Sequence, residues 1–535
     1  MTTQPLQQAQ PSLHHNSLAQ LIEQTCLRFG EHSAFSCRGV SLSFSQLERE
    51  SRAFAAYLQH HTGLQQGDRI ALQLPNCLQY VIAAFGALRA GLVLVNTNPQ
   101  YTEPELIYQF NDAGVTALVV ISDLLPGLAK VIKNTPVTTI ISTHLNDLQK
   151  PLPQPKTALN TIEFTQLLRQ GHQLSFTAPN LAPTDLALLQ YTGGTTGFIK
   201  AAMLSHSNVL ANLHQCSRAL EGVLEDGREQ LLTPLPIYHI YAFVVHLLYF
   251  SHGAHSTLLP LPRNLEEVIT SFARAPITAF AGISTLFKQL CQSSRFSELD
   301  FRSLKLTLAG ATSLQQASAE QWQQVTGCAV SQGYGLTEAS PVVTLNLAHA
   351  PQLSVGQPLR NTELKLVDDN DQEVKQGDCG ELLIKGPQVM QGYWRQPQET
   401  ALVLTQDGYL RTGDIAQQDE HGNLYIVDRK KDIIIVSGVN VYPTEVEAVL
   451  NRHPQVADCA VFSAPNERTG EQVQARIVLK QAAAKEHREE MLAAELYQFC
   501  EEQLAPYKIP KVMQFESELP VNHVGKLLRR QLANK

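Results

Sequence analysis

The sequence predicts an α/β protein. A large N-terminal domain of mixed and parallel sheets with helices, carrying a β subdomain, precedes a small α+β C-terminal domain. From about residue 17 to 360, short β-branched runs such as RIALQLPN and TALVVIS alternate with longer segments of helical period such as LQYVIAAFGALRAG. This alternation is typical of parallel sheets with covering helices. Two strand candidates, LKLVDD and GELLIKG, lie close together at 364–386 and indicate the β subdomain.

The chain divides into three expected segments. Residues 1–16 are polar and Gln-rich without an apolar core, so we expect a disordered lead-in and no secretory signal. Residues 17–429 form the expected N-terminal domain. Residues 430–535 form the expected C-terminal domain, in which DIIIVSGVNVYPTEVEAVL predicts strand, turn and helix with Thr444 as the N-cap. The strand candidates VADCAVFSAP and VQARIVLK follow, and then a Glu-rich helix near 485–503.

Composition and charge exclude several classes of function. The 535 residues carry a net charge of −8 and no basic block, so nucleic acid is not an expected partner. Nine cysteines without C-x-x-C spacing argue against a zinc site or a disulfide framework and favour a reducing, cytoplasmic location. The most apolar run, IYAFVVHLLYF, is about half the ~20 residues that span a bilayer, so we expect a buried helix there.

The stretch YTGGTTGFIK, from Tyr191 to Lys200, predicts a phosphate-binding loop. Its glycines can adopt backbone conformations that are closed to other residues, and successive N–H groups in a tight loop form an anion-binding concavity. Lys200 adds a positive charge, and the threonine hydroxyls can donate to phosphate oxygens. The spacing does not match the P-loop pattern G-x-x-x-x-G-K-[ST], which argues against a kinase or P-loop ATPase. The alternative interpretation of this stretch is an ordinary turn.

Two further turns carry residues suited to a nucleotide. In QGYGLTEAS, Tyr334 is framed by glycines and can stack on a base, while Glu338 offers carboxylate oxygens to Mg²⁺. In YLRTGDIA, Asp414 follows a glycine and can accept from two ribose hydroxyls. A strand-ending turn with a solvated glutamate and a turn-capping aspartate are the alternatives.

A histidine and a lysine complete the candidates. PLPIYHIYAF holds His239 between two tyrosines, and VNHVGKLLRR holds Lys526 on a Gly-framed turn. A satisfied core histidine and a solvated basic face are the alternatives for these two residues.

Taken together and in this order, the motifs resemble those of the adenylate-forming acyl-CoA synthetase family. YTGGTTGFIKAAMLSH is similar to its phosphate loop, YGLTE to its adenine and Mg²⁺ motif, and GKLLRR to its C-terminal lysine motif. DGYLRTGDIAQQDEHGNLYIVDRKKDIIIVSGVNVYPTEVE resembles the long signature of fatty acid–CoA ligases. The likeness covers about residues 17–535. Within the family it is nearest to bacterial long-chain fatty acid–CoA ligases, through LPIYHIYAF, KGPQVMQGYW and VDRKKDIIIVSGVNVYP.

The resemblance implies ATP-dependent ligation of a medium- to long-chain fatty acid to CoA through an acyl-AMP intermediate, with Mg²⁺ as cofactor and release of AMP and pyrophosphate. A fatty acyl-AMP ligase that delivers its acyl group to a carrier protein or another non-CoA acceptor is the alternative. A catalytically silent homologue that only binds ligand is a third reading. Peripheral contact with the inner face of a membrane and a homodimer stay open.

The resemblance also implies roles for individual residues. Lys526 reaches into the site for the first half-reaction, Thr337 contacts the α-phosphate, Glu338 binds Mg²⁺, and His239 lies where the acyl and CoA channels meet. The C-terminal domain is implied to be mobile, with Lys431 as the hinge and Gly438 on the path of the pantetheine arm of CoA. The implied ATP-binding residues are Thr192, Gly193, Gly194, Thr195, Thr196, Gly197, Lys200, Tyr334, Gly335, Asp414 and Arg429. The implied acyl pocket comprises Gly282, Ala309, Gly310 and Ala311.

Two departures from the family pattern bear on these expectations. Ala201 stands where the family commonly has glycine after the lysine, and we expect this methyl to spare every proposed ligand group. LAGATS, at 308–313, stands where close fatty acid–CoA ligases have a glycine-richer run. Added bulk there is expected to narrow the acyl channel and favour shorter acids.

Overall fold

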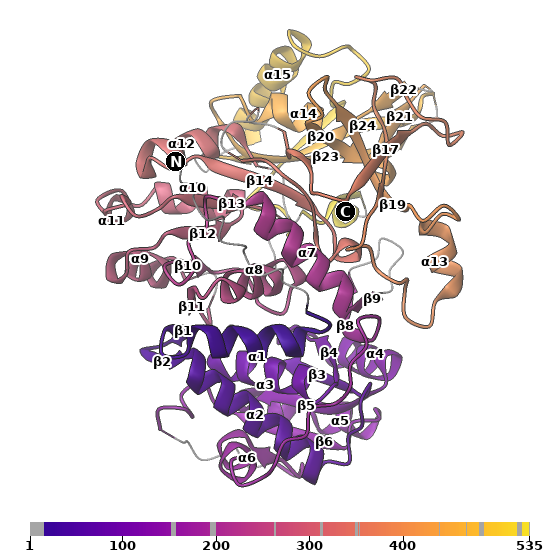
Figure 1. Cartoon of the computed structure of the whole chain (residues 1–535). Helices are drawn as coiled ribbons and strands as arrows, with labels where there is room; N and C mark the ends of the chain where they lie inside the picture. The colour runs from indigo at the N-terminus through magenta and orange to yellow at the C-terminus, as the bar shows by residue number, and fades with distance from the viewer. Residues whose placement is uncertain are drawn as a thin grey trace, which may run out of the picture.

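The computed structural model describes most of the chain, and Figure 1 shows how its layers follow one another from the N-terminus to the C-terminal domain. The described residues are 15–150, 157–192, 199–261, 264–310, 314–347, 351, 354–437, 439–466, 468–480, 486–521 and 527–533. Within them the predicted fold class is confirmed, since two large sheets with helices precede a four-stranded antiparallel sheet and a five-stranded C-terminal sheet.

The first sheet contains the strands predicted from RIALQLPN, TALVVIS and LALLQYT. Its strands are parallel except for the last pair, β8 and β9, which is antiparallel and flanks the predicted phosphate loop. The strand order is β7 (Ile162–Glu163), β6 (Thr139–Thr143), β5 (Val115–Ile121), β3 (Arg69–Gln73), β4 (Val93–Asn96), β8 (Leu186–Thr192) and β9 (Lys200–Ser205). Its helical segments are α2 (Phe44–His61), α3 (Leu78–Arg89), α4 (Glu103–Ala113), η1 (Ser122–Gly127), α5 (Ala129–Lys133) and α6 (Phe164–Gly171).

The second sheet lies above the first in Figure 1 and carries one side of the predicted site. Its order is β16 (Gln357–Pro358), β15 (Val342–Leu345), β14 (Val330–Gly335), β13 (Leu306–Ala309), β12 (Ala279–Gly282), β10 (Gln230–Thr233), β11 (His255–Leu258), β1 (Ser33–Cys37) and β2 (Val40–Ser43). The associated helices are α1 (Leu18–Phe29), α7 (His206–Ala219), α8 (Ile240–Ser251), α9 (Leu265–Arg274), α10 (Ser284–Cys291), α11 (Ser294–Ser297), α12 (Gln316–Thr326) and η2 (Thr337–Ala339).

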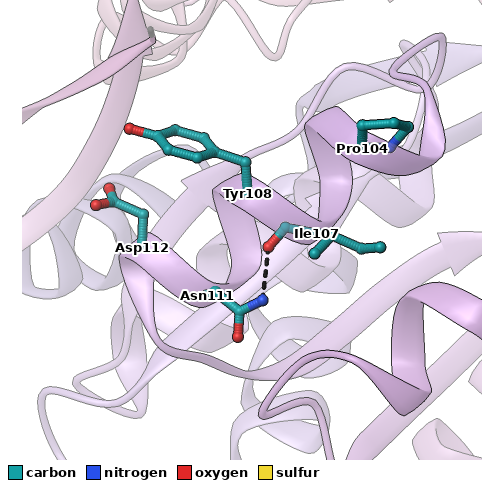
Figure 2. Close-up of a pocket in the computed structure, with 5 residues that line it drawn as sticks. All are labelled: Pro104, Ile107, Tyr108, Asn111 and Asp112. Carbon is teal, nitrogen blue, oxygen red and sulfur yellow. Dashed lines mark hydrogen bonds between the residues drawn. The ribbon is translucent and has the colours of Figure 1, made fainter.

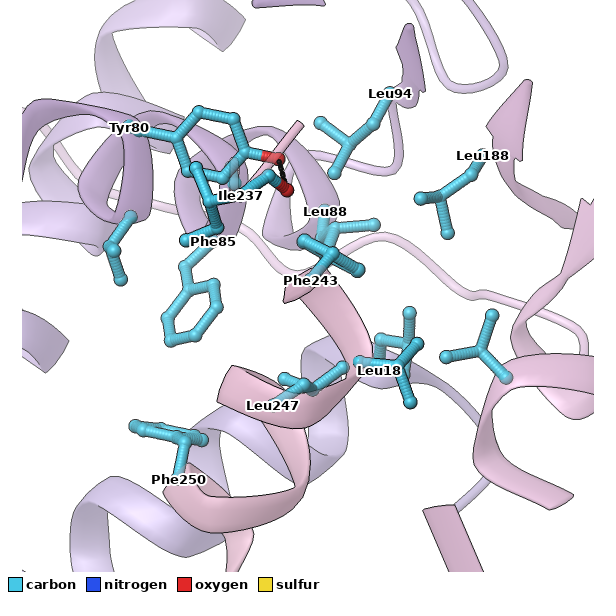
Figure 3. Packing of buried hydrophobic residues seen from close by; sticks show 14 of the residues in the cluster. Leu18, Tyr80, Phe85, Leu88, Leu94, Leu188, Ile237, Phe243, Leu247 and Phe250 are labelled. Atoms are coloured by element: carbon cyan, nitrogen blue, oxygen red, sulfur yellow. Dashed lines mark hydrogen bonds between the residues drawn. The ribbon is translucent and has the colours of Figure 1, made fainter. Parts of the chain in front are cut away.

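The largest hydrophobic core fills the space between these layers. Figure 3 shows side chains of α3 and α8 meeting there, with Phe85 and Phe250 packed edge to face at 4.9 Å between ring centroids. Helix α8 is apolar around its circumference and is almost wholly buried, so the buried helix predicted for IYAFVVHLLYF is confirmed. Among the described residues, no helix is both long and apolar enough to cross a membrane.

Two smaller sheets complete the chain. The predicted β subdomain is an antiparallel sheet in the order β17 (Glu363–Val367), β18 (Gly380–Lys385), β19 (Leu410–Gln418) and β20 (Leu424–Arg429), with α13 (Pro397–Val403) beside it. The C-terminal sheet is ordered β22 (Val439–Val441), β21 (Ile434–Val436), β24 (Gly470–Leu479) and β23 (Val456–Asn466), and β25 (Val512–Glu516) pairs with β24. Its helical segments are η3 (Lys430–Asp432), α14 (Pro443–Leu450), α15 (Glu486–Glu501) and α16 (Arg529–Ala533). The predicted boundary at residue 430 falls between β20 and η3.

The start of α14 differs from the prediction, because Thr444 is not its N-cap. Pro443 is the first helical residue, a position that suits its fixed φ and its missing N–H, and Tyr442 is therefore the cap. The Thr444 backbone N–H and hydroxyl instead donate to Asp428 Oδ2 at 2.9 and 3.0 Å. These bonds tie the first helix of the C-terminal domain to the last strand of the β subdomain.

The cysteines agree with the predicted absence of a disulfide framework. All nine are free thiols, and only Cys379, in the β17–β18 connection, is exposed.

Candidate active site

Asp414 joins three elements of the predicted nucleoside site. The Tyr334 hydroxyl donates to Asp414 Oδ2 at 2.6 Å, and Arg429 Nε lies 2.6 Å from Asp414 Oδ1. Tyr334 comes from β14, while Asp414 and Arg429 face each other across the antiparallel pair β19–β20. Asp414 is buried, and Arg429 is partly exposed. Burial, and then the Asp414 carboxylate, raise the pKa of Tyr334 well above its ordinary value, so the hydroxyl remains a neutral donor.

The turn after Tyr334 requires glycine. A Cβ on Gly335 would lie 2.2 Å from the Pro341 carbonyl oxygen, which is inside the contact distance of any real side chain. The Leu336 N–H donates to that same oxygen at 3.0 Å, which fixes the turn that begins η2. Thr337 and Glu338, the predicted α-phosphate and Mg²⁺ residues, are the first two residues of η2 and so follow directly from the Tyr334 strand.

Glu338 is oriented by a tyrosine that the sequence reasoning did not single out. The Tyr393 hydroxyl donates to Glu338 Oε1 at 2.8 Å, and the Met390 N–H donates to the Glu338 carbonyl at 2.8 Å. Burial, and then Glu338, raise the pKa of Tyr393, which keeps it a donor. Within the described residues, no group of three or more His, Cys, Asp or Glu side chains could hold a metal ion. The oriented carboxylate of Glu338 is of the kind that fits Mg²⁺, which is commonly held by one or two carboxylates and substrate phosphates.

Lys200 lies beside the same tyrosine. Its Nζ is 5.3 Å from the centroid of the Tyr393 ring and forms an ion pair with Glu399 of α13. Thr192 pairs with Lys200 across β8–β9, so the two ends of the predicted phosphate loop are adjacent. Tyr393 therefore connects the predicted phosphate lysine with the predicted Mg²⁺ ligand. The sequence signal for Tyr393 is the stretch KGPQVMQGYW, which resembles the family but does not by itself indicate a contact with Glu338.

Several predicted residues lie outside the described residues, and their roles stay predictions. They are Gly193, Gly194, Thr195, Thr196, Gly197, Ala311, Gly438 and Lys526. Ala201, the departure next to Lys200, is fully buried, and its carbonyl accepts from the Trp394 N–H at 2.9 Å. Its methyl is thus accommodated in the β9 packing.

The described residues of the predicted acyl pocket lie at the carboxyl ends of neighbouring strands. Gly282 of β12 pairs with Ala309 of β13, and Gly310 follows directly. A Cβ on Gly310 would lie 2.8 Å from Tyr241 Cζ, so the ring of Tyr241 packs closely against this glycine. Tyr241 is in the first turn of α8, where His239 is the N-cap residue. The structure thereby brings the His239 segment close to the residues predicted for the acyl pocket, and it adds Tyr241, which the sequence reasoning missed, as a neighbour of Gly310.

Two surface pockets are lined by residues of α4 and of the segment around Tyr393, and the lining of neither includes Tyr334, Asp414 or Arg429. One, of about 690 Å³, follows α4 and is lined by Pro104, Ile107, Tyr108, Asn111 and Asp112 (Figure 2). Its polar groups make internal bonds, because Asp112 Oδ2 accepts from the Tyr191 hydroxyl at 2.6 Å and Asn111 Nδ2 donates to the Ile107 carbonyl at 2.9 Å. A second, of about 410 Å³, is lined in part by Tyr393 and Met203. We assign no ligand to either pocket.

The chain is similar to known proteins over almost its whole length. A family model described as AMP-binding enzyme matches residues 22–394, and one described as AMP-binding enzyme C-terminal domain matches residues 445–526. The long-chain-fatty-acid–CoA ligase of Escherichia coli is 43% identical over 539 residues, which cover 97% of this chain and 95% of that protein.

Solved structures also match over almost the whole chain. The ATP-bound structure of MatB from Rhodopseudomonas palustris has a TM-score of 0.84 at 28% identity and covers 96% of this chain and 98% of that one. The apo structure of the same protein, with the same identity and coverage, has a TM-score of 0.75. The arrangement described here is therefore more similar to the ATP-bound form of that neighbour than to its apo form.

Proposed function

This chain belongs to the AMP-binding enzyme family, and on that premise we propose that it ligates a medium- to long-chain fatty acid to coenzyme A through acyl-AMP. The observation that carries the proposal is the 43% identity to a long-chain-fatty-acid–CoA ligase over 97% of the chain. The cluster of Tyr334, Asp414 and Arg429 supports it, because it combines an aromatic ring, a buried carboxylate and a partly exposed cation.

The first half-reaction uses the body of the protein and one residue of the C-terminal domain. A carboxylate is a poor electrophile at its carbonyl carbon, so its oxygen first attacks the α-phosphorus of ATP and pyrophosphate leaves. Asp414 would hold the ribose hydroxyls. Lys200 would leave its ion pair with Glu399 and bind phosphate oxygens instead. Thr337 and Lys526 would stabilise the charge that develops on the α-phosphoryl group. Glu338 would hold Mg²⁺, which neutralises phosphate charge when bound.

In the second half-reaction the CoA thiolate attacks the acyl carbonyl and AMP leaves. Lys526 is not needed for this step, and the face carrying Gly438 would replace it by rotation about Lys431. Such a conformational step between two reactions is a known form of gating. The close packing of Tyr241 on Gly310 would limit the width of the acyl channel.

A product assay tests the proposal directly. The protein is supplied with ATP, Mg²⁺ and mixed C6–C18 fatty acids, with and without CoA, and products are identified by mass spectrometry. We expect acyl-CoA only when CoA is present, together with AMP and pyrophosphate, and the acyl products give the chain-length preference. Accumulation of acyl-AMP regardless of CoA would instead point to another acceptor, and no acyl product would indicate a silent homologue. Contact with a membrane and formation of a homodimer remain predictions. Vesicle flotation tests the first, and sedimentation tests the second.

A further inference from the structure

The carboxylate of Glu399 holds the ammonium group of the predicted phosphate lysine. Its Oε2 atom accepts from Lys200 Nζ, in an ion pair that joins α13 to β9. The two partners are unequally enclosed, because the side chain of Lys200 is 14% exposed and that of Glu399 is 39% exposed. The ring of Tyr393 also lies beside the ammonium, with 5.3 Å between Nζ and the ring centroid. The glutamate is therefore the partner that can turn away into water.

The backbone sets the position of Glu399. The segment before α13 runs along β9, where the Met203 N–H donates to the Gly392 carbonyl at 2.9 Å. The Tyr393 N–H donates to Thr400 Oγ1 at 2.8 Å, and this bond joins that segment to the start of α13. Glu399 is the third residue of the helix, where the helix dipole favours a negative charge. The fold thus holds this carboxylate beside the lysine, in addition to the ion pair itself.

A phosphate oxygen that binds Lys200 has to take the place of this carboxylate. Lysine carries its charge as a compact ammonium group, and a carboxylate and a phosphate that approach the same ammonium repel each other. The free energy of breaking the ion pair is spent in the ATP complex and in the transition state alike. A cost that is uniform in this way raises the KM for ATP and leaves kcat unchanged.

We infer that Glu399 is an intramolecular competitor of ATP, which neutralises Lys200 before phosphate displaces it and thereby weakens the binding of ATP. The inference rests on the proposed function, in which Lys200 binds phosphate oxygens. Glu399 takes no part in the chemistry of either half-reaction. A glutamate that instead positioned Lys200 for catalysis would have the opposite effect, because its loss would weaken ATP binding or lower kcat.

The test measures the Kd for ATP by isothermal titration calorimetry, with Mg²⁺ present and with fatty acid and CoA absent. Glu399→Gln keeps the size of the side chain and removes its charge. We expect the Kd for ATP to fall ~3–10-fold, the combined scale of a partly exposed ion pair and of one like charge removed. In the acyl-CoA assay the KM for ATP should fall as well, with kcat within about twofold of wild type. An unchanged or higher Kd would overturn the inference.

A double-mutant cycle with Lys200 decides whether the effect depends on this lysine. In the Lys200→Gln background no ammonium remains to be released, so Glu399→Gln should lower the Kd for ATP by less than about twofold. An equal gain in both backgrounds would show general charge repulsion alone and would overturn the competition for Lys200.

A matched control stands at the start of α14. Glu445 is also the third residue of a helix that begins with proline, and its side chain, which is 41% exposed, pairs with Lys508 Nζ at 2.7 Å. Glu445→Gln removes a comparable charge and should leave the Kd for ATP unchanged. An equal decrease in Glu445→Gln and Glu399→Gln would overturn the specific role of Glu399. A wild-type protein that binds ATP but makes no acyl-CoA would instead refute the proposed function, which separates the two failures.

Discussion

Arg429 and Arg529 each pair with a carboxylate, but the two clusters differ in what surrounds the arginine. Arg429 and Asp414 occupy facing positions on neighbouring strands, with the Tyr334 hydroxyl as a third member, and the arginine side chain is 36% exposed. Arg529 is 19% exposed and is enclosed by carboxylates from α14 and η3. The arginine of the first cluster keeps about a third of its side chain exposed, where a ligand could reach it. The second leaves little for a ligand and holds chain segments together instead.

The largest expected effect comes from removing Lys526, which precedes Arg529 by three residues in the chain. Lys526→Ala should lower acyl-AMP formation by ~10²–10³-fold, because one transition-state donor is lost. Thioester formation from supplied acyl-AMP should be largely spared. Single-turnover assays of the two half-reactions measure this difference, and equal loss in both would refute the division of labour between the domains.

Breaking the first cluster should affect ATP use. Asp414→Asn removes the charge that Tyr334 and Arg429 share and weakens bonds to the ribose hydroxyls. Since hydrogen bonds to charged groups contribute ~1.5–3 kcal/mol, we expect kcat/KM for ATP to fall ~10–100-fold. Steady-state kinetics with varied ATP check this, with Asp300→Asn as the control because that carboxylate pairs with Arg302 on the surface. An unchanged KM and kcat for ATP would remove Asp414 from the nucleoside site.

A smaller effect on adenylation is expected when Glu338 keeps its charge but loses the hydrogen bond that orients it. Tyr393→Phe deletes the hydroxyl that donates to Glu338, a bond worth ~1 kcal/mol, so adenylation should fall ~5-fold and require more Mg²⁺ for half-maximal rate. Tyr409→Phe is the matched control, because the Tyr409 hydroxyl donates to Glu363 at 2.8 Å within the β subdomain. A Mg²⁺ titration that is the same for both variants would contradict a role for Tyr393 at the metal ligand.

The least effect on activity is expected from a substitution of His206, which belongs to neither cluster. This residue should instead contribute to the loss of folding stability at acid pH. Burial lowers its pKa from 6.5 to about 4, and its Nδ1 accepts from the Leu18 N–H at 3.2 Å. The unfolded chain therefore binds more protons between these pH values, so the free energy of unfolding falls as pH falls from about 6.5 to about 4. His206→Asn keeps an acceptor and cannot titrate, and denaturant unfolding across this range should show a flatter pH dependence. An unchanged slope would contradict the prediction.

Much of the fold could be predicted because periodicity is local. The alternating runs before residue 360, the buried helix α8 and the strands of the C-terminal domain were all visible in short windows of sequence. Thr444 was misplaced for the same reason, since a local cap rule cannot weigh a competing acceptor on Asp428, sixteen residues earlier.

The sequence predicted many individual residues of the candidate site but not the contacts between them. Tyr334, Glu338 and Asp414 stand in short recognisable stretches. Tyr393 and Glu338, which are hydrogen-bonded, are 55 positions apart in the sequence, and Glu399 and Lys200 are 199 positions apart. Arg529 meets Glu447 over 82 positions. Such pairings depend on how sheets and helices pack together, and no window of a single sequence contains that information.

The exposed thiol of Cys379 gives the unmodified protein a natural reporter for the proposed domain rotation. The other cysteines are buried, so a maleimide dye would label this position selectively. Cys379 also lies near enough to Tyr442, across the junction, to contribute after burial to the raised pKa of that tyrosine. A fluorophore attached here would lie between the β subdomain and the start of α14. A change in its emission during one turnover would support the proposed rotation, and constant emission would contradict it, with no cysteine introduced or removed.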